Sequence, residues 1–223
     1  MNDEPEVPAA GVPAPPPIDR RELLRRAGSV TVAAGFAISA AAVEAAHEHV
    51  AKQKAASPAG GKPPAPRFFD AREWAAVRAL SDLVIPADER SGSATDALVP
   101  EFVDYLLTDP LSEPRERERL QTQLRGGLAW LDRECAARFG RGFVDCADGE
   151  KRGVLDSIAW PERGRPGMEA GVAFFSLFRD LVASGYWTSR MGTEDLKYRG
   201  NTYVAEWHGC PPDVLSRLGL GER

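Results

Sequence analysis

The chain has 223 residues, of which 43% are hydrophobic and 27% are charged, and its formal net charge is −5 at pH 7. This mildly acidic balance, without a basic stripe or a recognisable nucleic-acid motif, argues against a nucleic-acid partner. The length fits one domain of about 100–150 residues once an N-terminal leader is set aside.

An export signal is expected near the start of the chain, within residues 1–46. A paired arginine stands just ahead of a moderately apolar, alanine-rich segment. This arrangement is typical of bacterial twin-arginine signals, which address a protein to the twin-arginine translocase. The sequence before the pair is rich in Pro and Ala and is expected to be disordered. The residues that match the signal are Arg20, Arg21, Leu23 and Leu24.

The segment that follows the arginines, Ala27 to Val43, carries no charge and consists mostly of Ala, Gly, Ser and Thr. It is a little shorter than the roughly 20 apolar residues that a spanning helix needs, so it is weak as a permanent anchor. A peptidase could cut at small residues such as Ala40-Ala41-Ala42, or the leader could stay as a weak tether. The sequence leaves this open. The alternatives to an export signal are an amphipathic surface helix and an arginine pair that happens to precede an alanine-rich linker.

Residues 47–67 are expected to be a linker, because they are rich in Pro, Ala and Gly. The folded domain is therefore expected at residues 68–223. Its sequence predicts an all-α fold, since apolar residues recur at helical spacing and no region alternates with a period of two. We expect a compact bundle of about five helices, preceded by a signal helix and the linker and followed by an irregular, aromatic-rich C-terminal tail.

Signals for helix ends place these five helices along the chain. The first is expected to start after a capping box of Asp70 and Glu73 and to end at Pro86. The others are expected from near Pro100, from a Ser112 cap with Pro114 in the first turn to an exit at Gly140, from an Asp148 cap to Pro161, and from the 162–167 loop to Gly185.

Two features single out the longest and the most apolar of these helices. Gly126 and Gly127 lie in the middle of the longest one. Each glycine there costs roughly 1 kcal/mol relative to alanine, so close packing against another helix is expected. The helix that ends at Gly185 is apolar on more than one face and is therefore expected at the centre of the bundle.

The tail from Tyr186 onward interleaves aromatic residues with Gly and Pro and fits no long helical period. A long irregular tail is usually functional or unfolded, and so many aromatic residues argue against an unfolded one. Two interpretations remain: a protein interface, which such residues favour, or a tail folded back over its own core. The aromatic residues are Tyr186, Trp187, Tyr198, Tyr203 and Trp207.

Few residues offer catalytic or metal-binding chemistry. His208 stands alone after the leader and linker, and a lone histidine cannot supply the ligand set usual for zinc or iron. No Gly-x-Gly-x-x-Gly motif follows a strand and no phosphate loop is present, so no Rossmann-type cofactor site is expected. Cys135, Cys146 and Cys210 form no Cys-x-x-Cys pair, which argues against covalent haem or iron–sulfur ligation. Whether Cys135 pairs with Cys146 is left open.

Three blocks of sequence carry a family resemblance. The first runs from Trp74 to Pro86 and reads Trp-Ala-Ala-Val-Arg-Ala-Leu-Ser-Asp-Leu-Val-Ile-Pro. The second runs from Phe174 to Ser189 and ends in Gly-Tyr-Trp-Thr-Ser. The third joins Tyr198-Arg-Gly-Asn201 to Trp207-His-Gly-Cys-Pro211. In this order, and with the leader, they resemble the gluconate 2-dehydrogenase subunit 3 family over nearly the whole chain.

The resemblance implies a non-catalytic small subunit of an exported, flavin-dependent dehydrogenase that oxidises sugars, sugar acids or glycosides. The partner would be a large subunit of the glucose-methanol-choline (GMC) type that carries FAD, and a cytochrome c subunit with haem c could be a third component. No cofactor would belong to this chain. It would escort its folded partner through the twin-arginine route to the periplasm or the outer face of the cytoplasmic membrane.

The resemblance also implies roles for residues of the tail. The partner interface would use Tyr186, Trp187, Tyr198, Asn201 and Trp207. Cys210 matches a position where some members have a cysteine near the partner, which would allow an intersubunit disulfide. Two other functions stay open: an autonomous exported enzyme that uses His208 and an acidic residue, and a tethered binding protein without a dehydrogenase partner.

Overall fold

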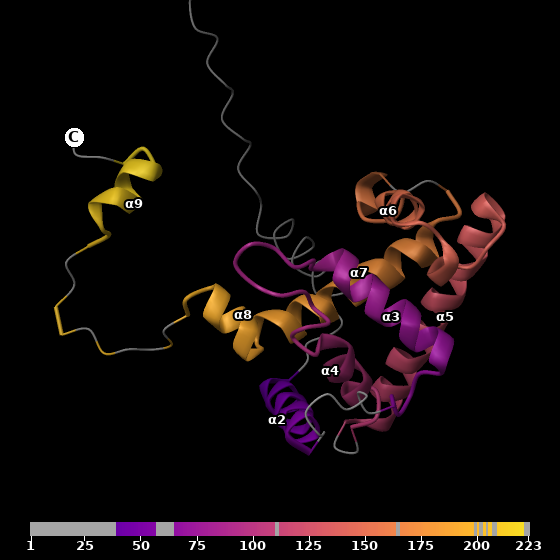
Figure 1. Cartoon of the computed structure of the whole chain (residues 1–223), viewed down its shortest axis with the longest axis horizontal. Helices are drawn as coiled ribbons and strands as arrows, with labels where there is room; N and C mark the ends of the chain where they lie inside the picture. Colours follow the sequence, from indigo (N-terminus) through magenta and orange to yellow (C-terminus); the bar gives the residue numbers. More distant parts are fainter. Residues whose placement is uncertain are drawn as a thin grey trace, which may run out of the picture. The chain divides into compact units, whose positions relative to one another are not determined.

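The computed structural model describes residues 39–56, 65–109, 112–163, 166–198, 200, 203, 205–206 and 209–220. Within them the chain forms eight α-helices, two short 3-10 helices and no strand, which confirms the all-α prediction (Figure 1). The α-helices are α2 (Ala40–Ala56), α3 (Ala71–Val84), α4 (Val99–Leu106), α5 (Pro114–Phe139), α6 (Asp148–Asp156), α7 (Glu169–Trp187), α8 (Arg190–Asp195) and α9 (Pro212–Arg217); the 3-10 helices are η1 (Phe143–Asp145) and η2 (Pro161–Arg163). Three of them, α2, α8 and α9, are additional to the five predicted helices.

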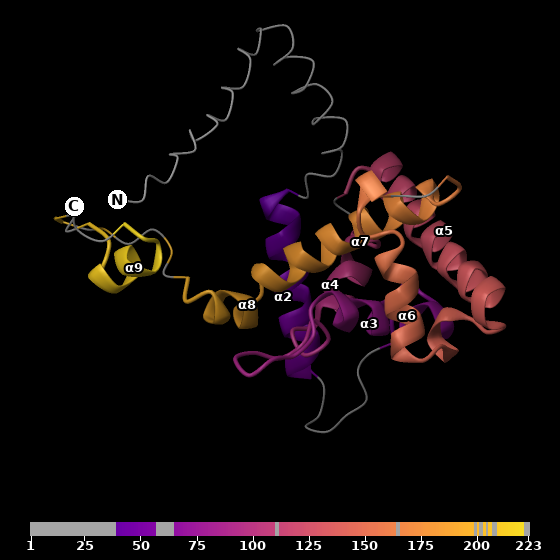
Figure 2. The ribbon, with the colours of Figure 1, turned by 90° about the horizontal axis from the view of Figure 1, so that it is seen from above.

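The central helix of the bundle is α7, as its apolar composition predicts. It contacts α3, α4, α5 and α8 (Figure 2). Burying a Phe or Leu side chain contributes about 1.5–3 kcal/mol relative to leaving it in water, so α7 supplies much of the core stability. Its buried residues are Gly171, Phe174, Phe175, Phe178, Leu181, Val182, Gly185 and Tyr186.

Two glycines allow α5 and α7 to approach closely. A Cβ atom added to Gly127 of α5 would lie 1.8 Å from Cδ2 of Phe174 on α7. On α7, a Cβ atom added to Gly171 would lie 2.5 Å from the Trp130 ring of α5. Gly126, by contrast, has no such neighbour within 4 Å. The close packing expected at the glycine pair is therefore confirmed for Gly127 alone.

Replacing Gly127 with alanine is expected to destabilise the fold by about 3 kcal/mol, because inserting a methyl group into a packed core costs typically 1–3 kcal/mol and the overlap with Phe174 is severe. The matched control is Gly126→Ala, which should stabilise the helix by about 0.5–1 kcal/mol. Urea unfolding of both variants measures the difference. Equal unfolding midpoints would show that α5 and α7 do not meet at Gly127.

Two helix ends follow the sequence signals. The Asp70 carboxylate accepts hydrogen bonds from the N–H groups of Arg72 and Glu73, both at 2.8 Å. The Glu73 carboxylate accepts in return from the Asp70 N–H at 3.0 Å, so the predicted capping box of α3 is confirmed. Gly140 ends α5 with a φ of 73°, a left-handed conformation that glycine adopts without strain.

Two expected caps are each wrong by one residue. The cap of α5 is Glu113 rather than Ser112, because the Glu113 carboxylate accepts from the Glu116 N–H at 2.9 Å. The cap of α6 is Ala147 rather than Asp148, which is the first residue of that helix.

The expected end of α7 at Gly185 is also wrong, since the helix continues to Trp187. Gly185 is buried, and a Cβ atom added there would lie 2.8 Å from the Phe102 ring and 3.2 Å from the Val99 side chain, both on α4. The glycine therefore provides a packing surface for α4 rather than a helix stop.

Helix α2 lies beside α4, in the stretch where the end of the leader and the linker are expected (Figures 1 and 2). Its residues Ala46 and Val50 are buried, so it packs as part of the bundle. The compact unit begins at Ala40, earlier than the boundary expected at residue 68. Arg20, Arg21, Leu23 and Leu24 lie outside the described residues. Among the described helices, none is long and apolar enough to cross a membrane.

Candidate functional site

Exposed apolar side chains gather along the C-terminal part of the chain. Among the described residues, every large apolar side chain that is exposed, apart from Trp160, lies between Trp187 and Leu220. Helix α9 within this stretch buries none of its residues. Apolar and aromatic surface of this kind marks interaction sites when it is contiguous. The exposed residues are Trp187, Leu196, Tyr198, Tyr203, Val214, Leu218 and Leu220, and we call 187–220 the C-terminal segment.

The five residues expected at a partner interface have different environments. Trp187 is 39% exposed and Tyr198 is 67% exposed, so both are accessible to a partner. Asn201 and Trp207 lie outside the described residues. Tyr203, which was an aromatic residue of the tail without an assigned role, is 89% exposed. Sequence spacing could have included Tyr203, because it lies in the same Gly-punctuated stretch.

Tyr186 is a core residue, which differs from its expected place on an interface. Its side chain is 1% exposed. Its hydroxyl group donates to the Gly92 carbonyl at 2.9 Å and lies 2.6 Å from the Ser91 hydroxyl. The Trp187 ring meets the Tyr186 ring edge-on, with 5.0 Å between the centroids. Tyr186 therefore anchors the end of α7 and positions Trp187 at the surface.

The loop between α3 and α4 holds the base of the C-terminal segment. Arg90 on this loop donates to the Asp195 carboxylate at 2.6 Å and to the Asp195 carbonyl at 2.9 Å. Gly192 on α8 is buried against the end of α7, where an added Cβ atom would lie 2.1 Å from the Tyr186 carbonyl oxygen. These contacts fix α8 on the bundle. The exposed residues after α8 therefore follow an element that is held in place.

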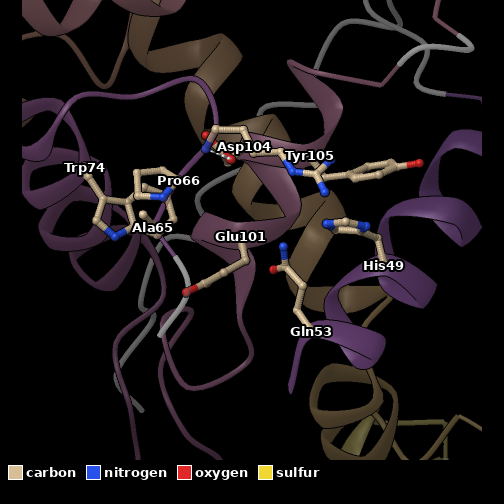
Figure 3. A pocket seen from close by; sticks show the side chains of 9 residues that line it. His49, Gln53, Ala65, Pro66, Trp74, Glu101, Asp104 and Tyr105 are labelled. Carbon is tan, nitrogen blue, oxygen red and sulfur yellow. Dashed lines mark hydrogen bonds between the residues drawn. The ribbon is translucent and has the colours of Figure 1, made fainter. Parts of the chain in front are cut away.

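A small polar cavity lies between α2, α3 and α4 (Figure 3). Its volume is about 10 Å³, which is room for roughly one water molecule. His49 and Gln53 of α2 line it on one side, and Glu101 and Tyr105 of α4 line it on the other. It is far too small for a substrate or a flavin.

Two acidic residues of α4, Asp104 and Glu101, are the carboxylates that line this cavity. The Asp104 carboxylate accepts from the backbone N–H groups of Arg67 at 2.7 Å and Phe68 at 3.0 Å, which fixes the chain as it enters α3. Oε1 of Glu101 lies 3.3 Å from Nη1 of Arg78, whereas its Oε2 is buried with no hydrogen-bond partner among the described residues.

Burial raises the pKa of the Glu101 carboxyl group, while a backbone hydrogen bond and the charge of Arg78 act in the opposite direction. The sequence could have indicated these buried acids, since Glu101 and Asp104 interrupt the apolar residues of α4. Through Arg78, Glu101 joins α4 to α3.

A second, wider cleft of about 170 Å³ lies between the start of α3 and α5. Its charged groups bind one another. Arg72 lies 3.3 Å from the Asp132 carboxylate and 3.1 Å from the Asp145 carboxylate, while Arg125 lies 3.2 Å from Glu73. Because each arginine is paired with a carboxylate, the cleft has the character of an ion-pair network on a helical surface.

The described part of the chain contains no group of three or more His, Cys, Asp or Glu residues able to hold a metal ion. His208 lies outside it. The thiols of Cys135 and Cys146 are free and buried, and that of Cys210 is free and exposed. Of the described features, the C-terminal segment with Cys210 is the best candidate for a binding function.

Residues 71–205 match the model of a family described as gluconate 2-dehydrogenase subunit 3. No curated protein and no solved structure matches the chain. The match begins at the first residue of α3 and covers the bundle from α3 to α7 and the first part of the C-terminal segment. The chain therefore belongs to the gluconate 2-dehydrogenase subunit 3 family.

Proposed function

We propose that the chain is the non-catalytic small subunit that binds and stabilises a GMC-type, FAD-bearing dehydrogenase and escorts it through the twin-arginine export route. The complex oxidises sugars, sugar acids or glycosides in the periplasm or at the outer face of the cytoplasmic membrane. FAD belongs to the large subunit, and haem c belongs to a third subunit where one is present. Membership in a family of dehydrogenase subunits supports this proposal.

The observation that carries the proposal is the exposure of the C-terminal segment. Tyr198 and Tyr203 are 67% and 89% exposed in the isolated chain. Burying a large apolar side chain against a partner contributes about 1.5–3 kcal/mol of binding free energy. The isolated chain leaves these side chains in water, so this free energy becomes available when a partner covers them. Aromatic residues with a polar tip are also enriched at the centres of protein interfaces. The segment is therefore the docking surface for the large subunit.

Cys210 belongs to the same segment and has an exposed thiol. In an oxidising compartment, an exposed thiol beside a partner can form an intersubunit disulfide. We assign this bond, where the large subunit offers a cysteine, to Cys210. Burial leaves Cys135 and Cys146 unable to reach a partner.

The docking role is tested with the double variant Tyr198→Ser, Tyr203→Ser. Losing two buried aromatic contacts should reduce the large subunit that co-purifies with the tagged chain at least ten-fold, since each 1.4 kcal/mol corresponds to a factor of ten. Because both side chains are exposed in the isolated chain, the thermal unfolding midpoint of the variant should stay unchanged. Gel densitometry and flavin absorbance of the isolate measure the result.

The matched control is Trp160→Ser, which changes a 54% exposed aromatic residue outside the C-terminal segment. This variant should retain the flavoprotein. A double tyrosine variant that keeps a full complement of large subunit would sink the proposed docking surface. A colourless isolate from the unmodified chain, with no large companion, would count against the dehydrogenase partner itself.

A further inference from the structure

Two histidines are among the side chains that hold helix α2 on the bundle. The His47 ring packs on Phe102 with 4.8 Å between centroids, and the His49 ring packs on Tyr105 at 4.6 Å. Both pairs are tilted by 31°. Ala46 and Val50 of α2 are buried, and other small side chains of the helix are half-buried. The two imidazole rings therefore supply the ring contacts by which α2 docks on α4.

The hydrogen bond of His47 defines where its ring carries a proton. Nε2 of His47 lies 2.7 Å from the Thr188 hydroxyl oxygen. The single hydroxyl proton of Thr188 is donated to the Ser184 carbonyl, so this oxygen accepts from a proton on Nε2 of His47. The neutral ring is thus bonded through Nε2, and acid would add its second proton at Nδ1 and place a cation in a partly buried site.

The two histidines differ in the charged groups that face them. Burial lowers the pKa of His47, and no neighbouring charge contributes to that shift. Burial is also the largest cause that lowers the pKa of His49; Arg67 and Lys52 lower it further, and Asp104 opposes them. Both histidines are therefore less easily protonated when α2 is docked than when it is free in water.

Glu101, which lines the cavity between α2, α3 and α4, responds to pH in the opposite direction from the two histidines. Burial raises its pKa, so its stabilisation of the docked state is present at low pH and is lost as the pH rises through its folded-state value. For the histidines, whose folded-state pKa is lowered, docking has full strength above the ordinary value of about 6.5 and weakens as the pH falls below it. The two histidines therefore oppose Glu101 as the solution is acidified.

We propose that α2 is a strap that acid releases from α4, with protonation of His47 as the releasing step and that of His49 in support. Release exposes the Phe102 and Tyr105 rings, together with the surface that Val50 covers. Asp104 of α4 also holds the backbone of Arg67 and Phe68 ahead of α3, and this attachment does not depend on the histidines. The inference concerns the fold and does not depend on the proposed dehydrogenase partner.

Hydrogen exchange of the full chain, followed by mass spectrometry at pH 7.5 and pH 5.5, tests this strap. After correction for the intrinsic pH dependence of exchange, the protection of peptides from α2 should fall several-fold at the lower pH. Peptides from α7 should keep their protection, since the core does not detach. An α2 protection that is equal at both pH values would overturn the proposal, because attraction between the protonated ring and Phe102 would then offset the cost of burial.

Variants identify the responsible group. His47→Phe keeps a ring against Phe102 but cannot be protonated, so the loss of α2 protection at pH 5.5 should shrink or disappear. Glu101→Gln should enlarge the loss, because the amide stays neutral at both pH values and so removes the pH dependence that opposes the histidines. A loss that is unchanged in the double variant His47→Phe, His49→Phe would overturn the assignment to histidine.

A measurement on the unmodified chain covers the case in which a variant fails to fold. The ring protons of His47, followed by NMR, should titrate below pH 6.5, and the amide signals of α2 should shift over the same pH range. Titration of His47 at or above pH 6.5 would contradict the proposal without any variant.

Discussion

With Arg20 and Arg21 both changed to lysine, a co-expressed large flavoprotein subunit should stay in the cytoplasm. Lysine keeps the positive charge but loses the planar guanidinium group with its five fixed donors, so a receptor that reads the arginine pair loses its contacts. The expected result is loss of periplasmic flavin-dependent dehydrogenase activity, while the cytoplasmic fraction retains the complex. Cell fractionation with immunodetection of both subunits measures it.

The control for this experiment is Arg25→Lys with Arg26→Lys, which changes two nearby arginines but leaves the pair intact. It should leave export unchanged. If the flavoprotein reached the periplasm with lysine at both positions of the pair, the escort role would be wrong, even if the two subunits still co-purified. The tyrosine variants of the C-terminal segment distinguish the two failures, because they test docking without touching the leader.

The arginine variants and the tyrosine variants change two separate parts of the chain, the leader and the C-terminal segment. The described bundle offers a tail of exposed aromatic side chains, and its clefts are either water-sized or lined by paired charges. The proposed function needs both the leader and the docking surface, so each is tested by its own variants.

The elements of the bundle were predictable where the signal is local. Asp70 and Glu73 stand at capping-box spacing, and the reciprocal bonds form as expected. Close packing was predicted for the pair Gly126 and Gly127 from its place inside a long helix, because a glycine there is costly unless a neighbouring helix uses the space, and it holds at Gly127. The Phe174 ring that occupies this space is 47 residues away, and nothing in the local sequence identifies it.

The one-residue errors at the caps have a local physical reason. Ser112 and Asp148 are both good cap residues, but Glu113 follows Ser112 directly and Glu150 lies two residues after Asp148, and both glutamates bond across the first turn. Glu113 itself accepts from the Glu116 N–H in the first turn of α5. Glu150 accepts the N–H of Ala147, which makes Ala147 the cap of α6. Residue preferences for capping do not resolve such a competition between neighbours.

The environments of Tyr186, His47 and His49 could not be predicted from the sequence, because their partners are distant. Tyr186 bonds to Ser91 and Gly92, more than 90 residues earlier. The two histidines lie in an alanine-rich stretch that has the composition of a leader and linker, and their docking depends on rings of α4. An aromatic residue at a helix end has the same local sequence whether it is buried or exposed, so exposure had to come from the structure.

The three cysteines of the native chain should differ in their alkylation rates by a large factor. At pH 8, iodoacetamide should label Cys210, whose thiol is exposed, and leave Cys135 and Cys146 unlabelled. Cys135 is completely buried, and burial, with a smaller contribution from the Cys146 thiol, raises its pKa to about 12. Only about one Cys135 thiol in ten thousand would then be ionised at pH 8, compared with about a quarter of ordinary thiols, so a rate difference of roughly a thousand-fold or more is expected. Peptide mass spectrometry measures the labelling of each site.

Unfolding and reduction turn this labelling into a test of the cysteine roles. In urea without reductant, all three sites should react if Cys135 and Cys146 remain thiols, whereas reaction of that pair only after reduction would show a disulfide in the exported chain. In the complex with the large subunit, an intersubunit bond should block Cys210, and reductant should restore its labelling. Rapid labelling of Cys135 in the native chain would contradict its burial in α5. Labelling of Cys210 that is as fast in the complex as in the isolated chain would place the docking surface elsewhere.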